Sequence, residues 1–145
     1  MSAYCVVDSE TYKIVKKEKI QNEELLIHMR YAEYEKVVIE MVACYGMPVG
    51  KEVFDTCIWI GRFIQEADEL GAVYDYIYRK EEKMNLCNSM KAKDCNIRQA
   101  LIDRFGVVGT KKNPGWFYGF KADIWSAYAV AVTYLDKEKG KFKNE

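Results

Sequence analysis

The chain has 145 residues, half of them hydrophobic, with 22 Lys and Arg against 22 Asp and Glu and a formal net charge of +0. This length suits one domain with a substantial core, and the balanced charge excludes a protein that attracts nucleic acid through a global basic field. No apolar run approaches the roughly 20 residues of a membrane helix and no signal segment is visible, so we expect a cytoplasmic protein without membrane contacts. Five cysteines without zinc-type spacing favour reduced thiols.

The chain begins with a predicted β-hairpin followed by a helix. The β-rich runs 2–7 and 11–16 flank the turn-forming residues 8–10, which indicates two paired strands. Asn22 followed by two glutamates is typical of a helix start. Apolar residues at helical spacing extend this helix to about residue 34.

The next predicted strand, over residues 36–42, contains the most informative residue, Glu40. The run is otherwise apolar after Lys36, as in buried parallel strands. An unpaired carboxylate in such a run is costly, and a bound metal ion would offset the cost. Ligands of α/β sheets gather at the carboxyl ends of strands, so Glu40 is the first active-site candidate. The alternative is a solvated acid at a strand end.

The rest of the chain alternates helices, loops and one further strand. Helices are predicted over 51–69, 91–104 and 122–135, a strand over 72–79, and glycine-containing loops over 41–50 and 107–119. The last helix is apolar on nearly every face, which predicts that it is packed inside the domain. We therefore expect a single domain over residues 1–135, followed by a polar C-terminal tail over 136–145.

Several basic and aromatic residues are candidates for contacts with nucleic acid. Cations suit phosphates, and an aromatic ring suits an unstacked base. The DNA-binding candidates are Lys91, Lys93, Arg104, Lys111, Lys112 and Trp116. Each lysine alone is more simply a solvated surface residue.

This succession of elements resembles the RuvC-type Holliday-junction resolvases of the ribonuclease-H-like nuclease superfamily, and most closely their small phage-like branch. The most specific parts are Ile39-Glu40 and the pattern Ala122-Asp123-x-x-x-Ala127. The resemblance covers almost the whole chain. It implies an α/β fold with a five-stranded mixed sheet flanked by helices. It also implies Mg²⁺-dependent cleavage of branched DNA by a homodimer, with Mn²⁺ as a substitute.

The resemblance transfers roles to individual residues. Glu40 matches the second catalytic carboxylate of the family and Asp123 a carboxylate at the start of the last helix, and both would be metal ligands. Lys93 falls where the family carries a functional lysine, and Lys83 falls within one position of another. Ser126 stands where the family usually has another acid, so it would offer a hydroxyl or hold a water near the metal. Taken alone, Asp123 is more simply a helix N-cap.

The chain departs from the family at its beginning. The family starts with a strand that carries Asp-x-Gly, whereas the run 2–7 aligns with the second strand of the family. We expect the first central strand to be missing, with Met1 an internal methionine of a longer reading frame or with a partner chain in the gap. The alternative function is a catalytically impaired junction-binding or scaffold protein. A generic α/β domain with other ligands is a third interpretation.

A resolvase must present two active sites to a two-fold symmetric junction, which predicts a homodimer. The helix over 51–69 carries an apolar stripe wider than one core requires, formed by Phe54, Ile58, Trp59 and Phe63. We expect part of this stripe to lie in the dimer interface.

Overall fold

The computed structural model describes residues 1–142, which form two compact units that each combine separate stretches of the sequence. Unit 1 consists of Met1–Ser2 and Ile20–Arg79, and unit 2 consists of Ala3–Lys19 and the residues from Lys80 onward. Within the described part of the chain, every helix is too short or too polar to cross a lipid bilayer. Each unit is described below by itself.

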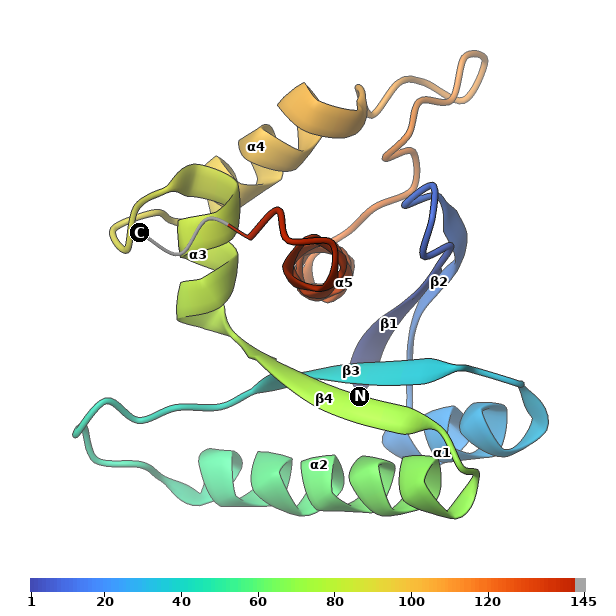
Figure 1. Cartoon of the computed structure of the whole chain (residues 1–145), viewed down its shortest axis with the longest axis vertical. Coiled ribbons are helices and arrows are strands. Elements are labelled where there is room, and N and C mark those ends of the chain that lie inside the picture. Colours follow the sequence, from blue (N-terminus) through green and yellow to red (C-terminus); the bar gives the residue numbers. More distant parts are fainter. Residues whose placement is uncertain (143–145) are drawn as a thin grey trace. The chain divides into compact units, whose positions relative to one another are not determined.

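Unit 1 is a two-stranded parallel sheet with helices on one face. Its elements are α1 (Asn22–Tyr31), β3 (Lys36–Met41), α2 (Lys51–Glu69) and β4 (Val73–Tyr78). Both helices lie on the same side of the sheet (Figure 1). The buried cluster between the layers contains Leu26, Met29, Phe63 and Ala67. Two residues of β3, Val37 and Ile39, pack against this cluster, because the alternation of a strand points both toward the helices.

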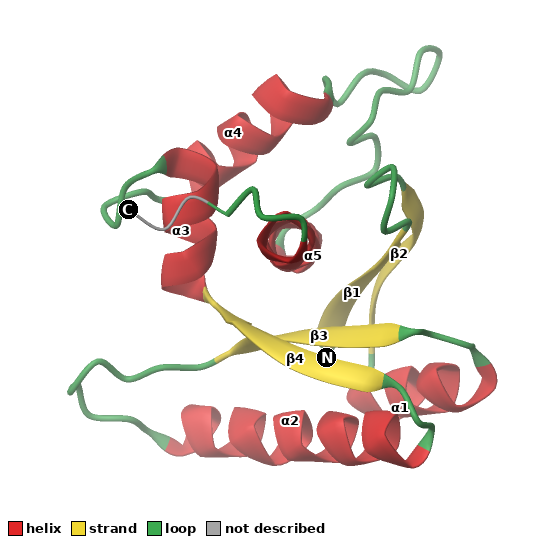
Figure 2. Cartoon of the chain, viewed as in Figure 1, coloured by secondary structure: helices red, strands yellow, loops and turns green. Residues whose placement is uncertain are grey.

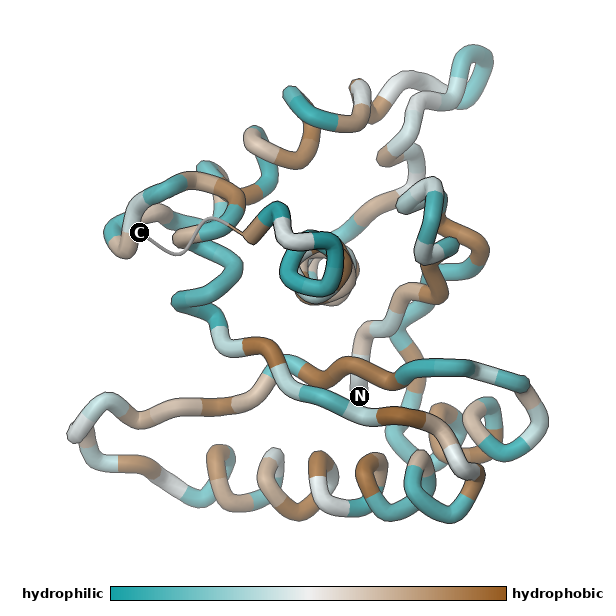
Figure 3. The backbone as a smooth tube through the Cα atoms, in the orientation of Figure 1, coloured by the Kyte–Doolittle hydropathy of each residue, from teal (hydrophilic) through white to brown (hydrophobic). Residues whose placement is uncertain are grey.

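The predicted helix 51–69 is confirmed at both ends. Gly71 follows it with a φ of +73°, a left-handed conformation that glycine adopts without a steric penalty. The chain then enters β4, which pairs with β3 from Lys36 opposite Val73 to Met41 opposite Tyr78. Figure 3 shows the apolar stretch of β3 that the sequence pattern assigned to a buried strand.

Unit 2 is built around α5 (Asp123–Glu138). Its other elements are β1 (Ser2–Val7), β2 (Ile14–Ile20), α3 (Arg79–Cys87) and α4 (Asp94–Phe105). Figure 1 shows α5 between α3 and α4 on one side and the β1 and β2 pair on the other. The core includes Leu101, Phe117, Tyr128 and Val132, all fully buried. The prediction that the last helix is packed inside is confirmed.

The start of β2 and the end of α5 differ from the sequence prediction. β2 begins at Ile14, not at residue 11, because the turn is longer. The Asp8 carboxylate accepts the N–H groups of Glu10 and Thr11, which prolongs the turn. α5 continues to Glu138, so the prediction that the polar tail starts at residue 136 was wrong: Asp136 is a buried helical residue.

The mixed α/β class is confirmed, but the five-stranded mixed sheet is not formed by the described residues. The strands form two separate two-stranded sheets, β1 with β2 and β3 with β4 (Figure 2). Each of the four strands pairs with a single neighbour, so no strand occupies a central position.

Candidate functional site

Glu40 lies at the carboxyl end of β3, opposite Ile77 of β4. Since Val37 and Ile39 face the helices of unit 1, the alternation of the strand places Glu40 on the other face of the sheet. Its side chain is half-buried and has no hydrogen-bond or ion-pair partner among residues 1–142. A half-buried carboxylate with both oxygens available suits a cation.

Asp123 begins α5 in unit 2, but it is not the N-cap. That position belongs to Ala122, which has a φ of 41° and a ψ of −118°, and no side chain caps the helix there. A positive φ is rare for a residue with a Cβ atom, and such strain is often found at functional sites. The Asp123 carboxylate is 62% exposed and its Oδ2 atom lies 2.6 Å from Nζ of Lys19. The simpler interpretation of Asp123 as the helix N-cap is therefore wrong.

The other residues transferred by the resemblance all lie in unit 2. Ser126 is half-buried one helical turn after Asp123. Lys83 is half-buried on α3. Lys93 is the exposed N-cap residue of α4, and its backbone N–H donates to the side chain of Asn96 at 2.9 Å. Among the described residues, no hydrogen bond or ion pair joins either lysine to Asp123.

The carboxylates of Glu40 and Asp123 each offer oxygen atoms that suit a hard divalent cation. Mg²⁺ prefers oxygen ligands and keeps several waters, so it needs few protein carboxylates. Glu40 in unit 1 and Asp123 in unit 2 offer one carboxylate each, and Asp123 already accepts a cation, the Lys19 ammonium. Residues 1–142 contain no group of three or more His, Cys, Asp or Glu side chains placed to hold a metal ion.

The two loop lysines stand at the end of a tight antiparallel turn in unit 2. Gly109 bridges Pro114, and the N–H of Gly115 donates to the carbonyl of Val108 at 3.0 Å. A side chain on either glycine would collide with the backbone of the opposite arm, so the turn requires both. Lys111 and Lys112 are exposed in this turn, which we call the lysine turn, residues 107–115.

Two of the predicted DNA-contacting residues are engaged inside unit 2. Trp116 stacks on Phe105 with ring centroids 5.3 Å apart, and its Nε1–H donates to the hydroxyl of Tyr128 at 3.2 Å. The guanidinium of Arg104 makes two hydrogen bonds of 2.7 Å to Asp136. Both side chains therefore fix the base of the lysine turn and the packing of α4 on α5.

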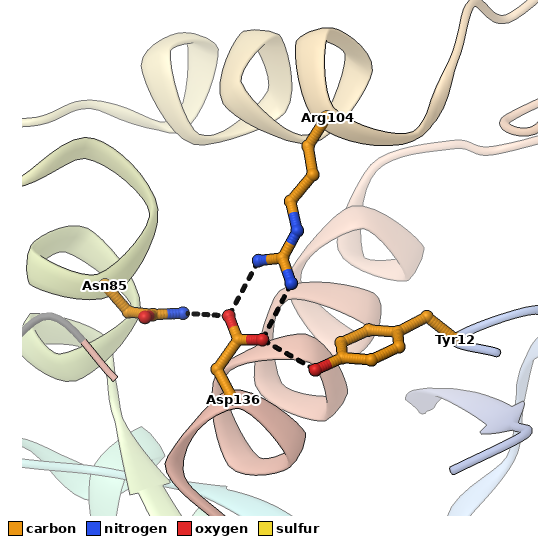
Figure 4. A network of polar contacts seen from close by, with 4 residues as sticks. All are labelled: Tyr12, Asn85, Arg104 and Asp136. Atoms are coloured by element: carbon orange, nitrogen blue, oxygen red, sulfur yellow. Dashed lines mark hydrogen bonds and ion pairs between the residues drawn. The ribbon is translucent and has the colours of Figure 1, made fainter. Parts of the chain in front are cut away.

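Asp136 is the centre of a polar network that joins α3, α4, α5 and the turn between β1 and β2 (Figure 4). Its Oδ1 accepts the hydroxyl of Tyr12 at 2.7 Å, and its Oδ2 accepts Nδ2 of Asn85 at 2.8 Å, beside the two bonds from Arg104. Burial alone would raise the pKa of Asp136, but the hydrogen bonds from Arg104, Asn85 and Tyr12 outweigh it and lower the pKa. Burial, with the bond to Asp136, raises the pKa of Tyr12 to about 12.

Sequence reasoning missed Lys19 and the Asp136 network. The buried position of Asp136 could have been predicted from helical spacing. It lies four residues after Val132 and three after Thr133, so it shares their face of α5, which is buried. An acid on such a face needs a cationic partner, and Arg104 lies in the last turn of the preceding helix. Lys19 had no signal, since 104 residues separate it from Asp123.

Comparisons with known proteins match the fold and not the sequence. No protein-family model and no curated protein sequence matches this chain. RuvC from Thermus thermophilus in complex with a Holliday junction substrate is similar with a TM-score of 0.66, 16% identity, and coverage of 97% of this chain and 90% of that one. Another Thermus thermophilus RuvC structure is similar with a TM-score of 0.61 and the same identity and coverage. The chain therefore has the RuvC fold of the ribonuclease-H-like type.

Proposed function

We propose that the protein is a metal-dependent endonuclease that cleaves four-way or branched DNA junctions, of the phage-like RuvC type and cytoplasmic. The observation that carries the proposal is the placement of Glu40. On a RuvC fold, it is a half-buried carboxylate at the carboxyl end of a parallel strand, without a hydrogen-bond or ion-pair partner in the described residues 1–142. Ligand sites of α/β folds gather at such strand ends.

The proposal gives the remaining residues defined tasks. Glu40 and Asp123 are the ligands of Mg²⁺, or of Mn²⁺ in its place, and Ser126 supports them through its hydroxyl. When bound, the metal supplies activation of water and neutralisation of phosphate charge. Lys83 and Lys93 hold the scissile phosphate, because a fixed ammonium stabilises the charge that develops there.

A second candidate is a junction-binding protein with impaired catalysis. It is favoured by the absence, among residues 1–142, of three acids gathered around one point and by a serine at position 126. Two carboxylates bind a divalent cation more weakly than three or four, so this candidate predicts tight binding of junctions with little or no cleavage.

A cleavage assay separates these candidates. The protein is incubated with a labelled four-way junction and with a linear duplex of the same sequence, in Mg²⁺, in Mn²⁺ and in chelator. The nuclease proposal expects symmetric nicks in the junction, only with metal, and none in the duplex. If the protein binds the junction in a gel-shift assay but does not cleave it in either metal, the result favours the second candidate, a junction-binding scaffold protein with impaired catalysis. Equal affinity for duplex and junction would contradict both.

The lysine turn should supply part of the affinity for DNA. Each phosphate contact contributes about 0.9 to the slope of log affinity against log salt concentration. Replacing Lys111 and Lys112 together by Ala should therefore reduce this slope by about 2, with no change in thermal stability. The measurement is junction binding by fluorescence anisotropy at several salt concentrations.

The matched control for the lysine turn replaces two exposed lysines of the N-terminal hairpin, Lys13 and Lys16, by Ala. This control removes the same charge from a surface that the proposal leaves without DNA contacts. An unchanged salt slope in the Lys111 and Lys112 variant, or an equal reduction in the control, would contradict the assignment.

The apolar face of α2 is proposed as the homodimer interface. Phe63 is buried in unit 1, whereas Phe54 and Ile58, one helical turn apart, are 59% and 62% exposed. Such neighbouring exposed apolar side chains mark contact surfaces, and a two-fold junction requires two copies of the active site.

Replacing both Phe54 and Ile58 by Glu should convert the dimer to a monomer, because four like-charged carboxylates would face each other in the interface. Sedimentation velocity at micromolar concentration measures the change. Thr56→Glu, on another face of the same helix, is the control and should remain dimeric. A wild-type protein that sediments as a monomer would remove α2 from the proposal.

A further inference from the structure

The ion pair between Lys19 and Asp123 has no task in the proposed chemistry, although it occupies a proposed metal ligand. Lys19 lies near the end of β2, and its Nζ is 2.6 Å from Oδ2 of Asp123 at the start of α5. Both residues belong to unit 2. The Lys19 side chain is 41% exposed, so solvent reaches both partners.

The surroundings direct Lys19 toward this carboxylate. Lys17, two residues earlier on β2 and thus on the same side of the strand, places its ammonium 5.5 Å from the centre of the Phe120 ring. Lys17 and Lys19 therefore both reach the segment that leads into α5. In contrast, Lys16 extends to Glu18 at 3.7 Å on its own strand. The strained backbone of Ala122 sets the position from which Asp123 meets Lys19.

A carboxylate oxygen that accepts a lysine ammonium at 2.6 Å cannot also coordinate a metal ion through the same lone pair. We infer that Lys19 is an internal counterion of Asp123, which holds the carboxylate through Oδ2 when no metal is present and competes with a divalent cation for its charge. The inference rests on the proposed function, because it assumes that Asp123 is a metal ligand.

Lys19 is therefore a positioning residue and an internal competitor of the metal. An exposed ion pair is weak, so a divalent cation displaces it at a small cost in apparent affinity. The free energy of such an exposed ion pair corresponds to a change of about two- to fivefold in a dissociation constant. Lys19 should therefore weaken the affinity of the site for the divalent cation by that factor. By linkage, the metal must loosen the contact of Lys19 by the same factor.

The test is Mn²⁺ binding to the full chain without DNA, measured from the electron paramagnetic resonance signal of free Mn²⁺. Lys19→Met should bind Mn²⁺ about two- to fivefold more tightly than the wild type. Lys16→Met, which removes the same charge from the same strand, should bind as the wild type does. Asp123→Asn should bind more weakly, and adding Lys19→Met to it should bring no gain, because the competition needs the carboxylate.

The outcomes separate this inference from the proposed function. Equal or weaker binding by Lys19→Met, with Asp123→Asn still impaired, would overturn the counterion role alone. A gain in Lys16→Met as large as in Lys19→Met would also overturn it, since general charge would then explain both. Binding by Asp123→Asn equal to wild type, or no binding by any of the proteins, would overturn the metal role of Asp123 and the counterion role together. Lys19→Gln, with a polar side chain, repeats the test and should match Lys19→Met.

Discussion

Asp136→Asn should lower the free energy of unfolding by about 3 to 5 kcal/mol, the range found when a buried ion pair loses one partner. All groups around the carboxylate are donors: the hydroxyl of Tyr12, the amide of Asn85 and both terminal nitrogens of Arg104. An amide has the same shape but offers a single acceptor oxygen. Its NH₂ group is a donor and would face the donors that now bind the carboxylate. Water cannot separate them, because residue 136 is buried, with 1% of its surface exposed.

Urea unfolding followed by circular dichroism measures this loss. Asp103→Asn is the matched control, because Asp103 is an exposed acid of α4 that accepts a hydrogen bond from Gln99. This control should change the stability by no more than about 0.5 kcal/mol. A loss in Asp136→Asn as small as in the control would show that the network contributes little.

The same carboxylate should make the stability depend on acid. Because folding lowers the pKa of Asp136 below its ordinary value of about 3.9, the charged form stabilises the native state. This contribution is complete above about pH 5, where the carboxyl is ionised in both states, and it is lost as the pH falls through the folded pKa. Asp136→Asn should therefore lose less stability than the wild type when the pH is lowered from neutral to below 4.

Glu40→Gln should reduce junction cleavage more than about a hundredfold and leave junction binding within about twofold of the wild type. Loss of a group that merely supports a metal ligand already costs about 10- to 100-fold, and loss of the ligand itself should cost more. Glutamine keeps the shape of the side chain but removes the charge that attracts the cation. Single-turnover cleavage with saturating protein measures the chemical step.

Glu35→Gln is the matched control for this variant. Glu35 is an exposed acid that precedes β3, at the end of the strand away from Glu40, and its replacement should leave cleavage unchanged. Full cleavage by Glu40→Gln would remove Glu40 from the catalytic centre. A wild-type protein that binds junctions and cleaves as slowly as Glu40→Gln would favour the scaffold candidate.

The sequence allowed most helices and strands to be predicted, because their signals are local. The apolar run of β3, the glycine after α2 and the apolar faces of α5 each determine a structure within a few residues. α3 was missed because Arg79–Cys87 has many charged residues and few apolar ones, so its helical period was hard to detect. Its place is set by the burial of Glu82 and Asn85 in unit 2.

The candidate site was predictable only in part for a related reason. Glu40 was found because a charge inside an apolar strand is a local anomaly. Asp123 was found through the family resemblance. No local sequence pattern predicts the strained backbone of Ala122 or the contact between Asp123 and Lys19. Arg104 and Trp116 were assigned to DNA contacts by residue type, and the structure gives them partners inside unit 2. Side-chain partners distant in sequence emerge only from tertiary packing.

The division of the chain into two units has a consequence for its synthesis on the ribosome. Ile20–Arg79 is one continuous stretch, so unit 1 can acquire most of its contacts soon after those residues emerge. The N-terminal hairpin must wait for α5, since Tyr12 meets Asp136, 124 residues later. At about 5 to 20 residues per second, this delay lasts roughly 6 to 25 seconds. During that time the hairpin lacks its partner in α5 and is exposed to chaperones and proteases.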